Sequence, residues 1–264
     1  MKKKLKIDVV FKTFGVITPL AGVVYAVTQN PTHLIYAVGI ALLIIITFSC
    51  INEDTLNAII YFFSPSGKNY NIMESSFLYT FFNKTDVQSE KRYQVKFTRN
   101  GVTSMPDCYS WTEDGPKEVR PLYAGQHVSY RWKHGNWDNY TVEFGKTYFR
   151  NSVTNTGTVL CGLKTNDYKS KLFLSCGIYE KTKSILLTIK VPPEILDEVA
   201  SAQLQAFKNS GDIFGNDIFS VPVEYDSIRQ HFSVRIEYPR KGWRYMLKLH
   251  CIEEYTPHLD QSSC

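Results

Sequence analysis

An uncharged stretch near the N-terminus constrains this chain more than any other feature. No Lys, Arg, Asp or Glu occurs from Thr13 to Asn52. The stretch holds two apolar segments, residues 13–29 (TFGVITPLAGVVYAVTQ) and 34–51 (LIYAVGIALLIIITFSCI), separated only by Asn-Pro-Thr-His. A membrane-spanning helix needs ~20 predominantly apolar residues, with a range of about 17 to 25. Each segment meets the lower limit, so the sequence predicts a transmembrane helical hairpin.

This stretch has two alternative interpretations. A secretory signal peptide shares the basic start, but its apolar core is shorter and a second apolar segment does not follow it at once. A buried hairpin of a soluble protein would need polar residues on its outer face. The run IALLIII at 40–46 offers no such face. We therefore favour two membrane spans over both alternatives.

The orientation of the hairpin follows from its basic flank. Five lysines and one aspartate lie within the first twelve residues, and positive flanks stay on the cytoplasmic side. The expected location is therefore the bacterial inner membrane, multi-pass, with both termini cytoplasmic and the lipid bilayer as a partner. The residues assigned to the spans are Thr13, Gly15, Pro19, Gly22, Gly39, Leu42 and Ile45. Gly15 and Gly22 lie on nearly the same helix face and favour close helix contact, although such residues are common in spans generally.

Composition places limits on the rest of the chain. The 264 residues carry a net charge of +5 and have a mean hydropathy of -0.21. Of the six cysteines, none forms a C-x-x-C pair, so the usual zinc and thioredoxin signals are absent. On the cytoplasmic side the cysteines would be free thiols.

From residue 91 onward the hydrophobic period is two. Apolar residues alternate with polar ones around residues 93–97, 140–144, 172–178, 219–225, 232–238 and 243–249, with Gly, Pro and Asn between the runs. Such repetition predicts an all-β domain, and we favour an antiparallel, Ig-like β-sandwich over a closed barrel. The expected organisation is a hairpin at 1–52, an interfacial or helical connector at 53–90, a β-sandwich at 91–255 and a flexible tail at 256–264.

Three segments outside the alternating runs are expected to be helical. Residues 54–63 (DTLNAIIYFF) form a short helix that Ser-Pro-Ser-Gly ends, and residues 74–82 (ESSFLYTFF) form a second one. Residues 193–207 (PEILDEVASAQLQAF) have Pro at the start and acidic residues in the first turns, a common helix beginning.

The sequence shows no familiar catalytic motif. It lacks G-x-G-x-x-G, the Walker lysine loop, H-E-x-x-H and G-x-S-x-G. His127 and His134 flank residues 128–133 and could meet across a sheet edge, but exposed histidines at strand ends are the usual case. Cys108 has no local partner that would activate it. No metal, cofactor or enzymatic activity is therefore expected.

Two groups of basic and aromatic residues are the candidate ligand or partner sites. The first comprises Arg131, Trp132, Lys133 and Trp137, and the second Arg240, Lys241, Trp243 and Arg244. Arginine beside aromatic rings can stack a base or bind a phosphate. The alternative is that the aromatic residues fill the sandwich core while the charges are solvated, and alternation favours this alternative.

The layout of the chain resembles the two-transmembrane membrane effectors of bacterial antiphage defence. The features that carry the resemblance are KKKLKIDVVFK, the two apolar segments, and the run from RYQVKFTRNGV (92–102) through CYSWTEDG (108–115) to YPRKGWRYMLKL (238–249). Of the two classes of such effectors, the retron-associated ones are the more similar to this chain. The β-strand-rich effectors of cyclic-oligonucleotide signalling come second, because this β region is longer than their compact nucleotide-sensing barrel.

The resemblance implies a toxic effector of abortive infection that a partner complex keeps inactive and that permeabilises the inner membrane when triggered. Its partners would be further copies of the chain in a homo-oligomer, and a sensor such as a reverse transcriptase with its RNA–DNA product. A cyclic oligonucleotide is the second candidate ligand. The alternative function is a membrane-anchored β-domain that senses a nucleotide or nucleic acid without forming a pore. A membrane-anchored enzyme is the third and least favoured function, because the sequence shows no convergent set of acid, base, nucleophile or metal ligands.

Overall fold

The computed structural model describes residues 53–111, 113, 115–208 and 219–252. The chain divides into two compact units, Met1–Ile60 and Tyr61–Cys264, and every described strand belongs to the second. The α-helices among the described residues are α3 (Glu53–Phe63) and α4 (Pro193–Leu196), and a 3-10 turn, η1, covers Lys169–Lys171. The expected helix at 54–63 is thus confirmed.

The membrane part of the expected fold needs correction. No helix among the described residues is long and apolar enough to cross a membrane. The longer helix has 11 residues, which at 1.5 Å per residue is about 16 Å, roughly half of the ~30 Å hydrocarbon core. The prediction of a transmembrane helical hairpin, and with it a multi-pass location in the inner membrane, is therefore wrong for the fold described here. The residues assigned to the spans, Thr13, Gly15, Pro19, Gly22, Gly39, Leu42 and Ile45, lie outside the described residues.

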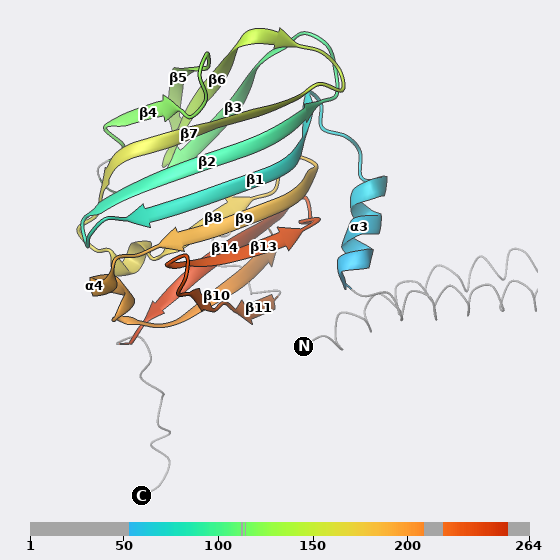
Figure 1. The fold of residues 1–264 in the computed structure, drawn as a ribbon. Helices are drawn as coiled ribbons and strands as arrows, with labels where there is room; N and C mark the ends of the chain where they lie inside the picture. Colours follow the sequence, from blue (N-terminus) through green and yellow to red (C-terminus); the bar gives the residue numbers. More distant parts are fainter. Residues whose placement is uncertain (1–52, 112, 114, 209–218, 253–264) are drawn as a thin grey trace, which may run out of the picture. The chain divides into compact units, whose positions relative to one another are not determined.

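Fourteen strands form three sheets in the described part of the chain (Figure 1). The seven-stranded sheet has the order β12 (Tyr225–Asp226), β13 (His231–Glu237), β9 (Thr182–Lys190), β1 (Tyr70–Phe81), β2 (Asp86–Phe97), β7 (Val153–Lys164) and β4 (Glu118–Pro121). The four-stranded sheet has the order β11 (Phe219–Pro222), β10 (Val199–Lys208), β14 (Trp243–Cys251) and β8 (Phe173–Gly177). The three-stranded sheet has the order β3 (Val102–Ser110), β6 (Trp137–Tyr148) and β5 (His127–His134).

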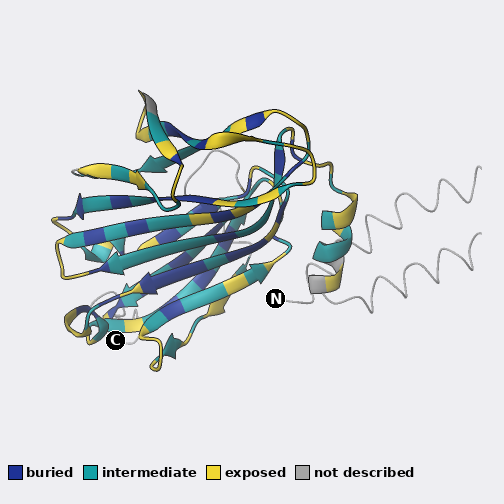
Figure 2. Cartoon of the chain, turned by 45° about the horizontal axis from the view of Figure 1, so that its top comes forward, coloured by how far each residue is buried: buried dark blue, intermediate teal, exposed yellow. Residues whose placement is uncertain are grey.

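Period-two alternation decides which face of the seven-stranded sheet is covered. In β2 the buried residues are Val87, Ser89, Tyr93, Val95 and Phe97, all of one parity. Successive side chains of a strand point to opposite faces, so these residues share one face. Figure 2 shows buried, intermediate and exposed residues in bands along the strands.

Both smaller sheets pack on this one face. The larger core joins β9 residues such as Ile185 and Leu187 to four-stranded-sheet residues such as Leu204 and Leu247. The second core joins Tyr93, Val95 and Phe97 of β2 to Val102, Met105 and Phe144 of the three-stranded sheet. Truncating a fully buried aliphatic side chain of this kind to alanine costs about 2–5 kcal/mol.

The all-β sandwich part of the expectation is compatible with this architecture. The Ig-like comparison fits only partly, because one large sheet is covered by two smaller ones and because β1 pairs with β9 in parallel, from Ile72↔Thr182 to Thr80↔Lys190. More than a hundred residues separate these paired strands. Local patterning therefore could not reveal the pairing.

Two of the expected helices are strands. Residues 74–82 fall in and next to β1, so the sheet begins at Tyr70, inside the segment expected to be a connector. Of residues 193–207, only Pro193–Leu196 are helical, and Val199–Lys208 form β10. Ala202, Leu204 and Ala206 are buried in β10 at every second position, so packing against β14 and the main core overrides the helix propensity of Ala, Leu and Gln.

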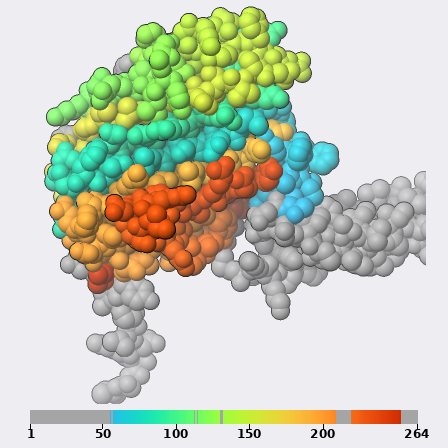
Figure 3. Space-filling model, in the orientation of Figure 1, coloured from blue at the N-terminus to red at the C-terminus, as the bar shows by residue number. Residues whose placement is uncertain are grey.

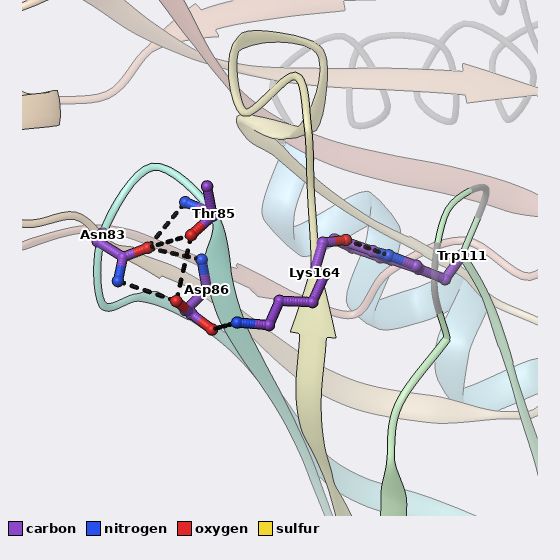
Figure 4. A network of polar contacts seen from close by, with 5 residues as sticks. All are labelled: Asn83, Thr85, Asp86, Trp111 and Lys164. Carbon is purple, nitrogen blue, oxygen red and sulfur yellow. Dashed lines mark hydrogen bonds and ion pairs between the residues drawn. The ribbon is translucent and has the colours of Figure 1, made fainter.

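The turn between β1 and β2 is fixed by side chains (Figure 4). Asn83 Oδ1 accepts hydrogen bonds from the backbone N–H groups of Thr85 and Asp86, each at 2.8 Å, and from the Thr85 hydroxyl at 2.9 Å. Asp86 in turn pairs with Lys164 of β7. The Trp111 indole N–H donates to the Lys164 carbonyl at 2.9 Å. This end of the seven-stranded sheet is therefore locked to the segment that follows β3.

Candidate interaction surface

The β5–β6 hairpin turns over two residues, Gly135 and Asn136. Gly135 has a φ of 57°, and glycine is needed at the first of two loop positions in a type II′ hairpin turn. The pairs His134↔Trp137, Lys133↔Asp138 and Trp132↔Asn139 follow the turn. A register shift between Tyr130 and Trp132 leaves Arg131 as the extra residue of a β-bulge.

The register places both tryptophans of the first group on one face. Residues directly opposite each other share a face, and so do residues two apart along a strand. Trp132, His134, Trp137 and Asn139 therefore lie together. In β6 the residues of the other parity, such as Tyr140, are buried toward the seven-stranded sheet, so the face that carries the tryptophans is the outer one.

Both tryptophans are exposed. Trp132 is 59% exposed and Trp137 is 42% exposed. His134 on the same face is exposed, and so is Lys133, which alternation places on the opposite face. The expectation that these aromatic residues fill the sandwich core is thus wrong for the two tryptophans, whereas Tyr140 does lie in the interior at 2% exposure. We call Trp132, His134, Trp137 and Asn139 the tryptophan face.

The Asn139 side chain stabilises this face by hydrogen bonds to both strands. Its side-chain Nδ2 lies 3.3 Å from the carbonyl oxygen of Trp132 and 3.4 Å from that of Trp137, and donates to both. The amide thereby links the two strands at the positions that carry the tryptophans. The space-filling view shows β5 and β6, in green and yellow-green, at the upper end of the strand region (Figure 3).

The second predicted group lies elsewhere. Arg240 stacks its guanidinium over the Trp243 ring, with Cζ 4.7 Å from the ring centroid. The Trp243 ring is half-buried, packs against the main core and stacks on Tyr245. Lys241 is exposed, and Arg244 in β14 pairs with Gly177 of β8. This group belongs to the four-stranded sheet, so the structure does not bring the two predicted groups together (Figure 1).

Beneath the three-stranded sheet lies a buried polar network that the sequence reasoning missed. Lys91 Nζ lies 3.1 Å from Asp107 Oδ1, and it also donates to the Cys108 carbonyl. The Tyr140 hydroxyl donates to Asp107 Oδ2 at 2.7 Å and lies 2.8 Å from Thr158 Oγ1. The signal was available: Lys91 has the same parity as Tyr93, Val95 and Phe97, so alternation turns it inward.

Burial sets the titration behaviour of this network. It raises the pKa of the Tyr140 hydroxyl far above its ordinary value, and the negative charge of Asp107 adds to the effect. Burial also raises the pKa of the Cys108 thiol. A thiol with a raised pKa is a poor nucleophile. The network is consequently equipped to hold sheets together rather than to react.

The structure offers no metal-binding arrangement in the described residues, where no cluster of three or more His, Cys, Asp or Glu occurs. His127 and His134 occupy the two ends of β5, which at ~3.4 Å per residue lie roughly 24 Å apart. The suggested meeting of these two histidines across a sheet edge is therefore wrong.

Comparisons with known proteins identify no family. No protein-family model matches the chain, and no curated protein matches it. Several solved structures share a weak likeness with this chain, among them the following three. The M1 zinc metallopeptidase from Deinococcus radiodurans is 8% identical with a TM-score of 0.35, over 70% of this chain and 43% of that one. The leukotriene A4 hydrolase from Saccharomyces cerevisiae is 10% identical with a TM-score of 0.38, over 74% of this chain and 33% of that one. Baculovirus P35 is 9% identical with a TM-score of 0.30, over 69% of this chain and 97% of that one.

The chain spans less than half the length of the two hydrolytic enzymes. At such low TM-scores and identities, these likenesses carry no argument about fold or function.

Proposed function

We propose that this protein is a non-enzymatic binding module whose tryptophan face takes up single-stranded nucleic acid. The observation that carries the proposal is the pair of exposed indole rings of Trp132 and Trp137 on one face of the three-stranded sheet. Leaving two such rings in water forgoes the stabilisation that burial of a large aromatic side chain gives. A stacked base would recover it.

The spacing of the rings suits an extended strand of bases. Trp137 is the diagonal neighbour of Trp132 across the β5–β6 pair, which places the two residues roughly 7 Å apart. Each ring can stack one base of a single strand, and base–aromatic stacking contributes about 1–3 kcal/mol per base. Base pairs in a duplex are already stacked, so the face favours single strands.

Charge distinguishes a nucleic acid from a protein partner. Tryptophan is also enriched at protein interfaces, so exposure alone fits either partner. The hairpin residues 127–138 contain Arg131, Lys133 and two histidines against one carboxylate, Asp138. Lys133 and Asp138 oppose each other on the other face, so it is the excess of basic residues along the hairpin as a whole that favours a phosphate-bearing partner.

The test uses the full chain and a fluorescently labelled, mixed-sequence single-stranded oligonucleotide, with anisotropy as the readout. We expect binding whose affinity weakens steeply with salt. The affinity should fall at least tenfold in a Trp132→Ala/Trp137→Ala variant, because the loss of about 1.4 kcal/mol of stacking energy already lowers affinity tenfold. Phe149→Ala is the matched control, because it removes an exposed aromatic ring outside the face. Equal affinity of the double variant, or no binding by the natural chain, would reject the proposal.

The role as a toxic effector of an antiphage system stays a prediction from resemblance. Its bilayer-permeabilising step requires two membrane spans, and no helix of the described residues is long and apolar enough to be one, so that step is not part of the proposal. The predicted homo-oligomer and the reverse transcriptase partner also stay predictions. An RNA–DNA product of such an enzyme would present single strands of the kind that the tryptophan face suits. Sequencing the nucleic acid that co-purifies with the chain from cells carrying its neighbouring genes tests this link.

A further inference from the structure

A cavity lies at the other end of β6 from the tryptophan face. This cavity of about 470 Å³ is bounded by the turn before β5 (residues 123–126), the end of β6 (residues 144–148) and the start of β7 (residues 154 and 155). Ligand sites for small molecules have volumes of about 300–1,000 Å³. The cavity is thus large enough for one small ligand.

The walls of the cavity are held by the fold. Gln126 is 7% exposed, its Nε2 donates to the Asn155 carbonyl at 2.9 Å, and its Oε1 accepts from the Thr156 hydroxyl at 3.1 Å. Gly125 and Gly145 both have positive φ, and a Cβ on Gly145 would overlap the Gly125 carbonyl oxygen. The turn therefore lies directly against β6, and β7 fixes it from the other side.

One wall presents an immobilised aromatic ring. The Tyr148 ring stacks on Phe97 with centroids 4.7 Å apart, and the Phe144 ring lies nearly perpendicular to it with centroids 5.4 Å apart. The Tyr148 hydroxyl lies 2.7 Å from the Thr154 hydroxyl oxygen. Two ring contacts and a hydrogen bond therefore fix this tyrosine as part of the cavity wall.

The charge of the cavity is positive. Lys146 lines it, with Nζ 5.1 Å from the centroid of the Tyr148 ring, and its side chain is exposed. No Asp or Glu occurs among the described residues that line the cavity. The remaining polar groups are the amide of Asn155, the amide of Gln126 and hydroxyls. An ammonium group beside an aromatic wall, without a carboxylate among these residues, favours an anionic ligand that carries an aromatic ring.

We infer that this cavity is a binding site for a small anionic ligand with an aromatic ring, of which a nucleoside monophosphate is the simplest case. Lys146 pairs with the phosphate, the aromatic wall around Tyr148 contacts the base, and Asn155 supplies a hydrogen-bonding amide. This inference does not depend on the proposed function of the tryptophan face, which uses other residues.

The test is isothermal titration of the full chain with AMP, and with inorganic phosphate for comparison. We expect one saturable site for AMP and at least tenfold weaker binding of phosphate, because phosphate lacks the ring. Lys146→Glu should weaken AMP binding at least tenfold, since a hydrogen bond to a charged group is lost and a like charge replaces it. Ala124→Trp, which places a large side chain at an exposed position of the cavity wall, should weaken it similarly. Lys183→Glu makes the same charge change at an exposed position in β9 and should leave AMP binding unchanged.

Two further arms separate the cavity from the tryptophan face. The Trp132→Ala/Trp137→Ala variant should keep AMP binding, and Lys146→Glu should keep oligonucleotide binding. The inference is overturned if the natural chain does not bind AMP, if phosphate binds as tightly, if Lys146→Glu binds AMP unchanged, or if AMP binding disappears only in the double tryptophan variant.

Discussion

Lys91 of β2 and Asp107 of β3 form an ion pair of 3.1 Å in the interior, where their side chains are only 14% and 9% exposed. The pair connects the seven-stranded sheet to the edge strand of the three-stranded sheet. A buried pair contributes little net stability compared with apolar residues, but breaking it is costly because one charge stays behind without its partner. Here Tyr140 supplies a further donor to the carboxylate.

Removing the cation should therefore destabilise the protein strongly. We expect Lys91→Met to lower the free energy of unfolding by about 3–5 kcal/mol, because the Asp107 carboxylate stays buried without its partner. In the double variant Lys91→Met/Asp107→Asn the loss should be smaller, since no charge remains. Urea unfolding followed by circular dichroism measures both, and a loss below about 1 kcal/mol for the single variant would contradict the buried pairing.

The Asp86–Lys164 pair predicts an acid-dependent loss of stability. Hydrogen bonds from Lys164 and Asn83 lower the pKa of Asp86 from 3.8 to about 2. A carboxyl whose pKa is depressed by folding contributes stability that is present above its unfolded pKa and is lost as the pH falls through the folded one. The contribution should therefore disappear between about pH 4 and pH 2. Thermal unfolding of the natural chain should show this decline, and Asp86→Asn should show a shallower one over the same interval.

A matched pair of glycine substitutions tests the close approach beside the cavity. Gly101 and Gly145 have φ values of 78° and 69°, but a Cβ would meet open space at Gly101 and the Gly125 carbonyl at Gly145. We expect Gly101→Ala to cost about 1–2 kcal/mol from backbone strain alone. Gly145→Ala should cost at least ~3 kcal/mol, because steric overlap adds to the strain. Equal losses in urea unfolding would show that the turn and β6 are further apart.

Tryptophan fluorescence tests the exposure of the tryptophan face without any ligand. Trp132 and Trp137 are exposed, whereas Trp111 and Trp243 pack against the main core. Acrylamide should therefore quench the natural chain more efficiently than a Trp132→Phe/Trp137→Phe variant. Trp243→Phe is the control, and it should raise the mean quenching efficiency because it removes a shielded ring. Quenching that is unchanged in the double variant would place the two tryptophans in the interior.

The alternating segments of the sequence predicted strands well. The runs around Tyr93, Tyr140, Phe232 and Trp243 are strands in the structure, because a half-buried strand must alternate its side chains. Segments in which the alternation is weaker led to wrong predictions of secondary structure. Residues 199–208 have the composition of a helix, yet their alanines and Leu204 fill the core as β10.

The candidate surfaces were only partly visible in the sequence. The basic and aromatic group at 131–137 was found, but alternation alone favoured burying its tryptophans. The bulge at Arg131 and the register with β6 put Trp132 and Trp137 on the face that no sheet covers. Asp107 and Gly145 carried no local signal, since each matters through a contact with a residue distant in the chain.

The sequence by itself determined which residues alternate, where most turns fall and that the described part of the chain is mainly β. Only the tertiary structure decided which faces are buried, how β1 meets β9, and that Lys91 meets Asp107. The physical reason is that a side-chain period is a property of a few neighbouring residues, whereas the covering of a face depends on strands that long loops bring together.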